Sequence, residues 1–227
     1  MNKRNLLILE KAINCYSFPK VIYDIKKRVP VKMKSMREVE DLIKKQLVSG
    51  NPELVKSALS NVLYWGYNRS GYGEHRMNVF RDEVQKPQLE AFMKLLKDDS
   101  MSLVKIQKLR MSQFSGMSFI SKIMMFLDPK SYVVLDLKLI QLKDESTSGN
   151  PLNRIKFGIK DTTIRITCES EDSYFQWCKL CKEISHEYFD GKYRPVDIER
   201  GFFEMIERRQ IDEGRMLIGE FIKELQK

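Results

Sequence analysis

The sequence predicts a mainly α-helical protein with one small β-hairpin. Apolar residues recur at helical spacing along most of the 227 residues, whereas residues 154–167 alternate apolar and polar side chains. The content of 42% hydrophobic and 31% charged residues is typical of a globular protein. Internal repeats, low-complexity tracts and long linkers are absent from the sequence, so we expect one domain over residues 1–227.

Periodicity and helix-terminal residues give the helices in order. Residues 3–15 predict one amphipathic helix, and residues 36–49 predict a second that stops at Gly50. Pro52 suits the first turn of a third helix, residues 52–67. Further helices are expected at 76–84, 86–98, 103–111, 118–127, 137–145, 171–189, 194–210 and 213–226.

The charge balance favours a polyanionic partner. The chain has 40 Lys and Arg against 31 Asp and Glu, a net charge of +9. Residues 20–37 hold seven Lys or Arg and one acid, Asp24, which predicts either a solvated surface or a phosphate-facing patch. No apolar run approaches the roughly 18 residues of a membrane span, and the start does not resemble a secretory signal. We therefore expect no membrane association and a cytoplasmic location, nucleoid-associated if the source is prokaryotic.

Two clusters that could carry chemistry are interpreted as structural. Cys178 and Cys181 share a helix face, but a zinc site needs two more ligands and the chain has only two histidines. We interpret them as small buried side chains and expect no metal site. Asp197 and Glu199 do not face each other on a helix, and a buried salt bridge involving Arg200 is expected instead.

Residues 103–127 predict a helical hairpin with a turn at residues 112–117. A glycine there, Gly116, allows backbone conformations closed to other residues and a close approach to another surface. Free N–H groups at the start of the second helix favour an anion such as a phosphate. The residues expected to bind it are Ser115, Gly116, Met117 and Ser118. A plain helical hairpin is the alternative.

Residues 64–78 interleave aromatic residues, glycines and cations. Aromatic planes can stack on bases while arginines hold phosphates. We expect Trp65 to belong to the core, and Arg69 and Arg76 to contact nucleic acid.

The segment after the hairpin carries a family resemblance. A glycine turn, an aromatic residue, a lysine, a second aromatic residue and a Leu-Asp pair follow one another at Gly116, Phe119, Lys122, Phe126, Leu135 and Asp136. In this order the sequence resembles the helix-hairpin-helix DNA glycosylase superfamily, and most of all the prokaryotic 8-oxoguanine DNA glycosylase-like proteins. Residues 193–203, "YRPVDIERGFF", are similar to that family's closing helix. The resemblance implies a glycosylase-like helical fold and duplex DNA as the partner.

The resemblance also implies roles for two residues. Asp136 would stabilise the positive sugar as a flipped-out base departs, or it simply caps the following helix. We expect it at a helix N-terminus, partly exposed and lining a cleft. Lys122 would form a Schiff base with the sugar. In the commoner alignment the nucleophile falls on Ile120, which points to the other side of the helix.

Several functions stay open at this point. The chain is a monofunctional glycosylase, a bifunctional one if Lys122 is the nucleophile, or a non-catalytic DNA-binding module on the same scaffold, for example in a restriction or defence system. The non-catalytic module is favoured by two departures from the family pattern. Position 120 holds isoleucine instead of the nucleophilic lysine, and the turn lacks the usual proline and second glycine. A protein-interaction domain is a more distant alternative. No cofactor is expected apart from a monovalent cation that the hairpin could hold, and no obligatory protein partner.

Overall fold

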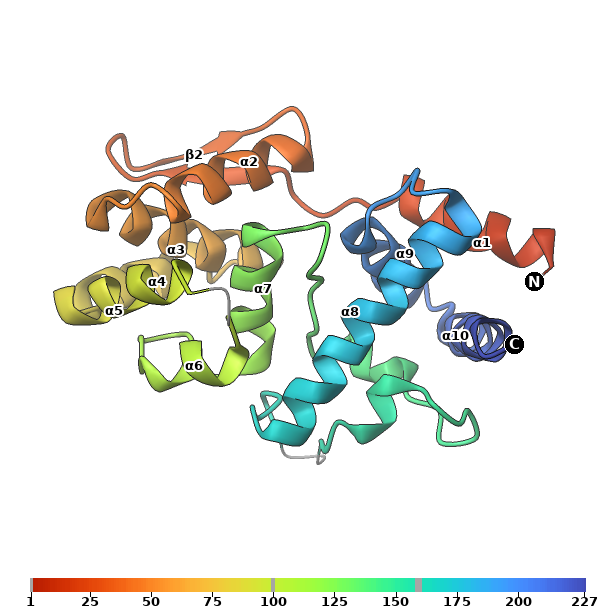
Figure 1. Cartoon of the computed structure of the whole chain (residues 1–227). Coiled ribbons are helices and arrows are strands. Elements are labelled where there is room, and N and C mark those ends of the chain that lie inside the picture. Colours follow the sequence, from red (N-terminus) through yellow and green to blue (C-terminus); the bar gives the residue numbers. More distant parts are fainter. Residues whose placement is uncertain (1, 99–100, 158–160) are drawn as a thin grey trace. The chain divides into compact units, whose positions relative to one another are not determined.

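The structure is a computed structural model that describes residues 2–98, 101–157 and 161–227. Within these residues the chain forms ten α-helices and one two-stranded antiparallel sheet, which confirms the mainly α class with a small hairpin (Figure 1). The chain divides into two compact units. The central unit is Phe18–Asp128, and the terminal unit is Met1–Ser17 with Pro129–Lys227. The single domain expected from the sequence stays a prediction.

The central unit is built around one apolar helix, α3 (Pro52–Gly66). Asn51 caps it by accepting hydrogen bonds from the N–H groups of Glu53 and Leu54, and Pro52 occupies its first turn. Because α3 is buried along most of its length from Val55 to Trp65, it packs against β1, α2, α4, α5 and α7. The other elements of this unit are β1 (Val21–Asp24), β2 (Val29–Lys32), α2 (Met36–Leu47), the 3-10 helix Asn68–Ser70, α4 (Gly73–Glu83), α5 (Lys86–Leu96), α6 (Leu103–Lys108) and α7 (Met117–Leu127).

The terminal unit is built around α9 (Pro195–Glu207). This helix packs against α1 (Lys3–Asn14), α8 (Cys168–Phe189) and α10 (Ile211–Leu225). Two 3-10 helices, Leu139–Leu142 and Pro151–Arg154, complete the described elements of this unit. In the part of the chain that the structure describes, no helix is long and apolar enough to cross a membrane.

A salt bridge inside α9 confirms the structural interpretation of its charged residues. The Arg200 guanidinium, 4% exposed, donates to Asp197 Oδ1 at 3.3 Å, and Arg194 binds the same carboxylate at 2.9 Å. Burial alone would raise the pKa of Asp197, but the hydrogen bonds from Arg194 and the charge of Arg200 outweigh burial and lower it. The ion pair therefore stabilises this unit rather than serving acid–base chemistry.

The β-hairpin expected at residues 154–167 is wrong in its position. The sheet is formed by β1 and β2, near the start of the central unit. Within 154–167 none of the described residues is in a strand, and residues 158–160 lie outside the described residues.

Burial against helices, not strand pairing, explains the alternation in that segment. Ile155 and Ile164 are fully buried. The Ile155 carbonyl accepts from Lys143 Nζ at 3.0 Å, and the Arg165 carbonyl accepts from Ser170 Oγ at 2.8 Å. Side chains thus satisfy these backbone acceptors, which in a hairpin would bind a neighbouring strand.

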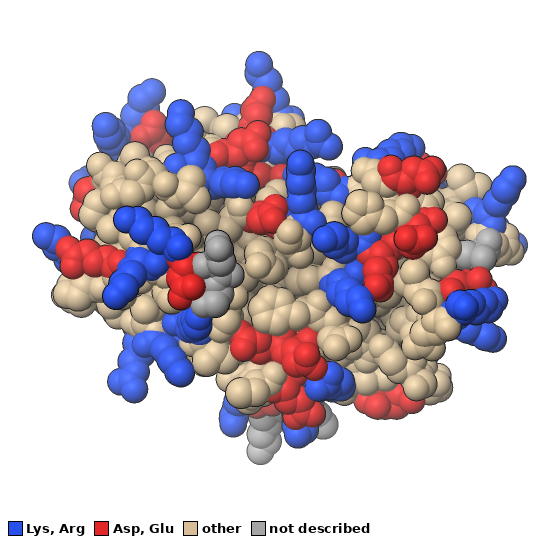
Figure 2. Space-filling model, viewed as in Figure 1, with Lys and Arg blue, Asp and Glu red and all other residues tan. Residues whose placement is uncertain are grey.

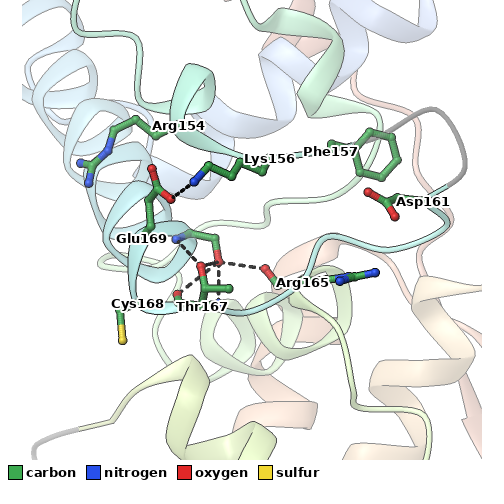
Figure 3. A pocket seen from close by; sticks show the side chains of 9 residues that line it. Arg154, Lys156, Phe157, Asp161, Arg165, Thr167, Cys168 and Glu169 are labelled. Carbon is green, nitrogen blue, oxygen red and sulfur yellow. Dashed lines mark hydrogen bonds and ion pairs between the residues drawn. The ribbon is translucent and has the colours of Figure 1, made fainter.

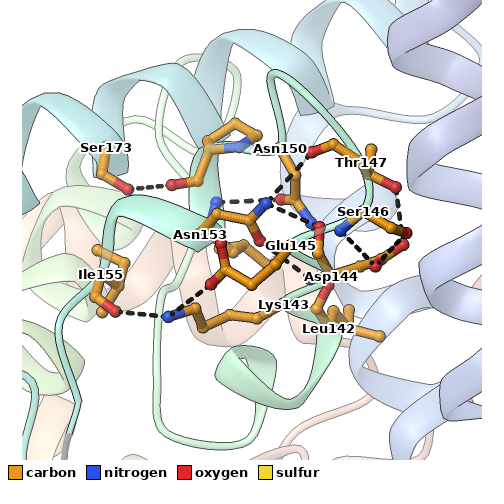
Figure 4. A network of polar contacts seen from close by, with 12 residues as sticks. Leu142, Lys143, Asp144, Glu145, Ser146, Thr147, Asn150, Asn153, Ile155 and Ser173 are labelled. Atoms are coloured by element: carbon orange, nitrogen blue, oxygen red, sulfur yellow. Dashed lines mark hydrogen bonds and ion pairs between the residues drawn. The ribbon is translucent and has the colours of Figure 1, made fainter.

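The α-helix predicted for residues 137–145 is also not found. Only the 3-10 helix Leu139–Leu142 forms, and a loop held by a polar network follows it (Figure 4). Asn150 Nδ2 donates to the Leu142 carbonyl at 3.1 Å, and the hydroxyls of Ser146 and Thr147 donate to Asp144, which lowers the pKa of that carboxyl. Such side-chain bonds compete with helical backbone bonds, so the helix ends early.

Candidate functional site

The hairpin predicted for residues 103–127 is present as α6, a turn and α7. Within the turn, Arg110 (φ 52°) and Gln113 (φ 68°) adopt the left-handed conformation. Gly116 has φ −116° and ψ 164°, extended backbone that other residues also adopt. The expectation that Gly116 supplies an unusual backbone conformation is therefore wrong, because the sharp change of direction occurs at two non-glycine residues.

The first turn of α7 has the features of an anion site. Gly116 is its N-cap, gives no side-chain capping bond, and no acidic residue lies in the first turn. The N–H groups of this turn and the helix dipole are thus not neutralised by a capping side chain. Met117 is fully buried, so its contribution is limited to its N–H, while Ser118 is half-buried and Ser115 is exposed. Gln107 Nε2 donates to the Ser115 carbonyl at 2.8 Å and fixes the last residue before the cap.

Basic residues accompany this turn. Lys108 and Arg110, together with the turn itself, line a cavity of about 490 Å³ in the central unit. Both residues are exposed, so they can meet a phosphate next to the α7 N-terminus.

An aromatic stack between Tyr67 and Phe119 of α7 lies next to Lys122. The rings of Tyr67 and Phe119 are stacked with centroids 4.3 Å apart at 23°. Lys122 Nζ lies 5.0 Å from the Phe119 centroid and donates to the Ser118 carbonyl at 3.0 Å. Lys122 is only 6% exposed, which is unusual for lysine. Its ammonium is therefore positioned by a ring face and a backbone carbonyl.

A glycine makes room for this arrangement. A Cβ at Gly66 would lie 2.6 Å from Phe119 Cε1 and 3.2 Å from Lys122 Cδ. The end of α3 therefore approaches α7 more closely than any larger residue permits.

The two arginines from residues 64–78 are exposed and rest on aromatic rings. Arg76 lies 5.5 Å from the Tyr67 centroid and donates to Gln113 Oε1 at 3.1 Å, which ties α4 to the hairpin turn. Arg69 lies 4.9 Å from the Phe18 centroid. Sequence reasoning missed Gln113, because nothing in the sequence pairs it with Arg76. DNA contact by both arginines stays a prediction.

Trp65 belongs to the core, as predicted. It is 3% exposed, and its Nε1 donates to the Pro19 carbonyl at 3.1 Å. Its ring packs against Phe18 and Phe126, with centroids 4.6 and 5.2 Å away.

Asp136 lies in the terminal unit, after a buried extended segment. Tyr174 OH donates to the Val133 carbonyl at 3.0 Å and anchors that segment. Asp136 is half-buried, as expected, and its Oδ1 accepts from the Lys138 N–H at 3.0 Å. It precedes the 3-10 helix Leu139–Leu142, not the α-helix that the sequence predicted. The cleft expected around Asp136 stays a prediction.

The alternative nucleophile position is closed to chemistry. Ile120 is fully buried, on the side of α7 that packs into the central unit. Lys122 is the one lysine within Met117–Leu127, so it is the amine that α7 offers.

The buried cysteines are unreactive. Burial raises the pKa of the Cys178 thiol to about 12 and also raises that of Cys181. Such thiols stay protonated at neutral pH. Among the described residues, no group of three or more His, Cys, Asp or Glu is arranged to hold a metal ion.

A cavity of about 570 Å³ at the start of α8 contains none of the predicted site residues (Figure 3). Of its three cations, Lys156 pairs with Glu169 at 2.8 Å and Arg154 pairs with Asp172. Thr167 caps α8 by accepting from the Ser170 N–H at 3.2 Å. The helix terminus and two of the three cations of this cavity thus already have partners.

The helical hairpin, the buried Lys122 and the half-buried Asp136 follow one another in the order on which the sequence resemblance rests. A family model described as "Putative 8-oxoguanine DNA glycosylase OGG-like protein" matches residues 37–203. The match covers well over half of the chain, includes the hairpin, Lys122 and Asp136, and confirms the resemblance inferred from sequence. The chain belongs to this family. No match is found among curated proteins or solved structures.

Proposed function

We propose that this protein removes a damaged or modified base from duplex DNA. The observation that carries the proposal is the family match, which spans both Lys122 and Asp136. The family description names 8-oxoguanine, which makes it the first base to test. Enzymes of this kind flip the target nucleotide out of the stack, because its glycosidic bond is inaccessible inside the duplex.

In this proposal Asp136 stabilises the sugar as the bond breaks. The departing base leaves positive charge on C1′ and the ring oxygen, and a carboxylate nearby lowers the energy of that state. The half-buried position of Asp136 suits this role, because the group can meet a substrate while its Oδ1 stays oriented by the Lys138 N–H.

Lys122 is the proposed nucleophile. In its neutral form Nζ attacks C1′, and the bond from C1′ to the base breaks with its electron pair leaving on the base, which takes up the proton that Nζ gives up. Opening of the sugar ring at O4′ then gives an imine between C1′ and Nζ. The fixed position of Nζ, 5.0 Å from the Phe119 centroid and 3.0 Å from the Ser118 carbonyl, supports this assignment. Water attack, without an imine, is the outcome if Lys122 is only structural.

The first experiment measures base release in single turnovers on duplexes carrying 8-oxoguanine, deaminated bases or alkylated bases. Asp136→Asn keeps the acceptor for the Lys138 N–H but removes the charge. We expect unchanged stability and a rate about 10²- to 10³-fold lower. Asp190→Asn is the matched control, because Asp190 is an exposed left-handed residue of the same unit and asparagine tolerates that conformation.

The second experiment traps the imine with borohydride on the same duplexes. We expect a covalent protein–DNA complex with wild type and none with Lys122→Gln. A trapped complex that persists in Lys122→Gln would refute the role of Lys122. Absence of base release from every duplex by wild-type protein would refute the enzyme proposal and favour a non-catalytic DNA-binding module.

A further inference from the structure

The β-hairpin formed by β1 and β2 carries a group of cations. These cations are separate from the turn between α6 and α7 that was described above as an anion site. The residues of the β-hairpin, with those that flank it, are exposed and basic: Lys20, Lys26, Lys27, Arg28, Lys32, Lys34 and Arg37. Among the described residues, none of these side chains forms an ion pair with a carboxylate. Figure 2 shows Lys and Arg side chains projecting along the edge where Figure 1 places β2 and α2.

The hairpin is anchored on its inner strand. Tyr23 N–H donates to Asn61 Oδ1 at 2.6 Å, Tyr23 OH donates to Glu74 at 2.7 Å, and the Tyr23 ring lies 5.1 Å from that of Tyr64. Val21 and Met77 complete this buried cluster. The strand β1 is therefore fixed to α3 and α4, and β2 is the outer, exposed strand.

The tip of the hairpin is fixed as well. Asp24 Oδ1 accepts from the N–H groups of Lys26 and Lys27 at 3.0 Å each, and the Arg28 N–H donates to the Asp24 carbonyl at 2.7 Å. Arg28 is in the left-handed conformation, with φ 57°. The backbone is thus set before any partner arrives, so binding orders only the side chains.

Protection of an exposed strand edge explains part of this pattern. Lysine and proline on an edge strand prevent pairing with other chains, and Lys32 and Pro30 of β2 fit that role. It does not explain three consecutive cations in the turn, Lys26, Lys27 and Arg28, because a turn offers no edge to protect.

We infer that this hairpin is a second phosphate-binding surface, which grips the backbone of duplex DNA without reading its sequence. The inference rests on the proposed function only in taking DNA as the partner. Unpaired, exposed cations gain affinity by releasing counterions from the phosphates, so their contribution is electrostatic and falls as salt rises.

The test compares two variants of equal charge. Lys26→Gln/Lys27→Gln/Arg28→Gln neutralises the tip and leaves the backbone bonds of Asp24 in place. The control neutralises three exposed lysines of the terminal unit, Lys3, Lys182 and Lys223, also to Gln. Affinity for an undamaged duplex is measured over a range of salt concentrations.

The slope of log affinity against log salt is negative, and we expect the tip variant to reduce its magnitude by about two to three. Its affinity should be about 10- to 100-fold weaker near 0.1 M salt. The control should change both much less. A second variant, Lys32→Gln/Lys34→Gln/Arg37→Gln, should weaken binding in the same way and guards against misfolding of the tip. Equal slopes for tip and control variants would overturn the inference, as would a wild-type chain that does not bind duplex DNA. Absence of base release alone would refute only the proposed function.

Discussion

Replacement of Gly66 by alanine tests how closely α3 approaches α7. The added Cβ would lie 2.6 Å from Phe119 Cε1 and 3.1 Å from its Cζ, well inside van der Waals contact. The Phe119 ring cannot simply rotate away, because Tyr67 stacks on it at 4.3 Å and Lys122 Cδ would lie 3.2 Å from the same Cβ. The methyl group must therefore displace the ring and the lysine with it.

The expected magnitude follows from two opposing effects. Overpacking a rigid site costs about 1–3 kcal/mol. Alanine in a helix is favoured over glycine by about 1 kcal/mol, and Gly66 is the last residue of α3, where the gain is smaller. We expect a net loss of about 1 kcal/mol in the free energy of unfolding, or roughly 2–4 °C in Tm.

Denaturant unfolding of a double-mutant cycle measures this effect. Phe119→Leu removes the ring atoms that the new methyl group would meet, so Gly66→Ala should cost less in a Phe119→Leu background. A coupling energy of about 1 kcal/mol is expected. If Gly66→Ala stabilises the protein by its helix propensity and shows no coupling to Phe119→Leu, the close packing described for this site is wrong. The imine trap should also weaken in Gly66→Ala, because Lys122 moves with the ring.

Two further predictions follow from the hairpin and from α9. Gly116→Asp places a good N-cap at α7 but adds a negative charge where a phosphate is proposed to bind. The stability of the helix should therefore hold, while affinity for duplex DNA falls for all sequences. Unchanged affinity at moderate salt would contradict phosphate binding at this turn. The lowered pKa of Asp197 means that its ion pair stabilises the fold above the ordinary aspartate pKa of about 3.9, and that this stability disappears as pH falls through the lowered value. Asp197→Asn should therefore be less stable than wild type at neutral pH and approach it in acid, as thermal unfolding across pH would show.

Local signals in the sequence determined most of the helices. Asn51 and Pro52 specify the start of α3 through a cap and a fixed φ, and Gly50, with φ 69°, allows the chain to leave α2. The two-residue offset between Ile120 and Lys122 indicates that they point to different sides of α7. These features act within a few residues along the chain, so the sequence alone reveals them.

The position of the sheet depended on tertiary contacts. Residues 154–167 and residues 21–32 both carry strand-like features, and alternation alone favoured the first segment. The second forms the sheet because Tyr23 binds Asn61 and packs against Tyr64 of α3. In the first, side chains bind the carbonyls of Ile155 and Arg165, which a neighbouring strand would otherwise bind. The β-branched pair Val21-Ile22 and the turn at Asp24 are local signals for this β-hairpin, but the cations around them indicate a charged surface equally well.

The candidate site shows the same division. Its residue types and their order, from Gly116 through Lys122 to Asp136, were evident from the sequence and placed the chain in its family. The environment of Lys122 was not evident from the sequence. Gly66 and Tyr67 lie more than fifty residues earlier in the chain and come close to Lys122 only when α3 packs against α7. A lysine's position is set by contacts across helices, and no local pattern encodes which distant ring or glycine will supply them.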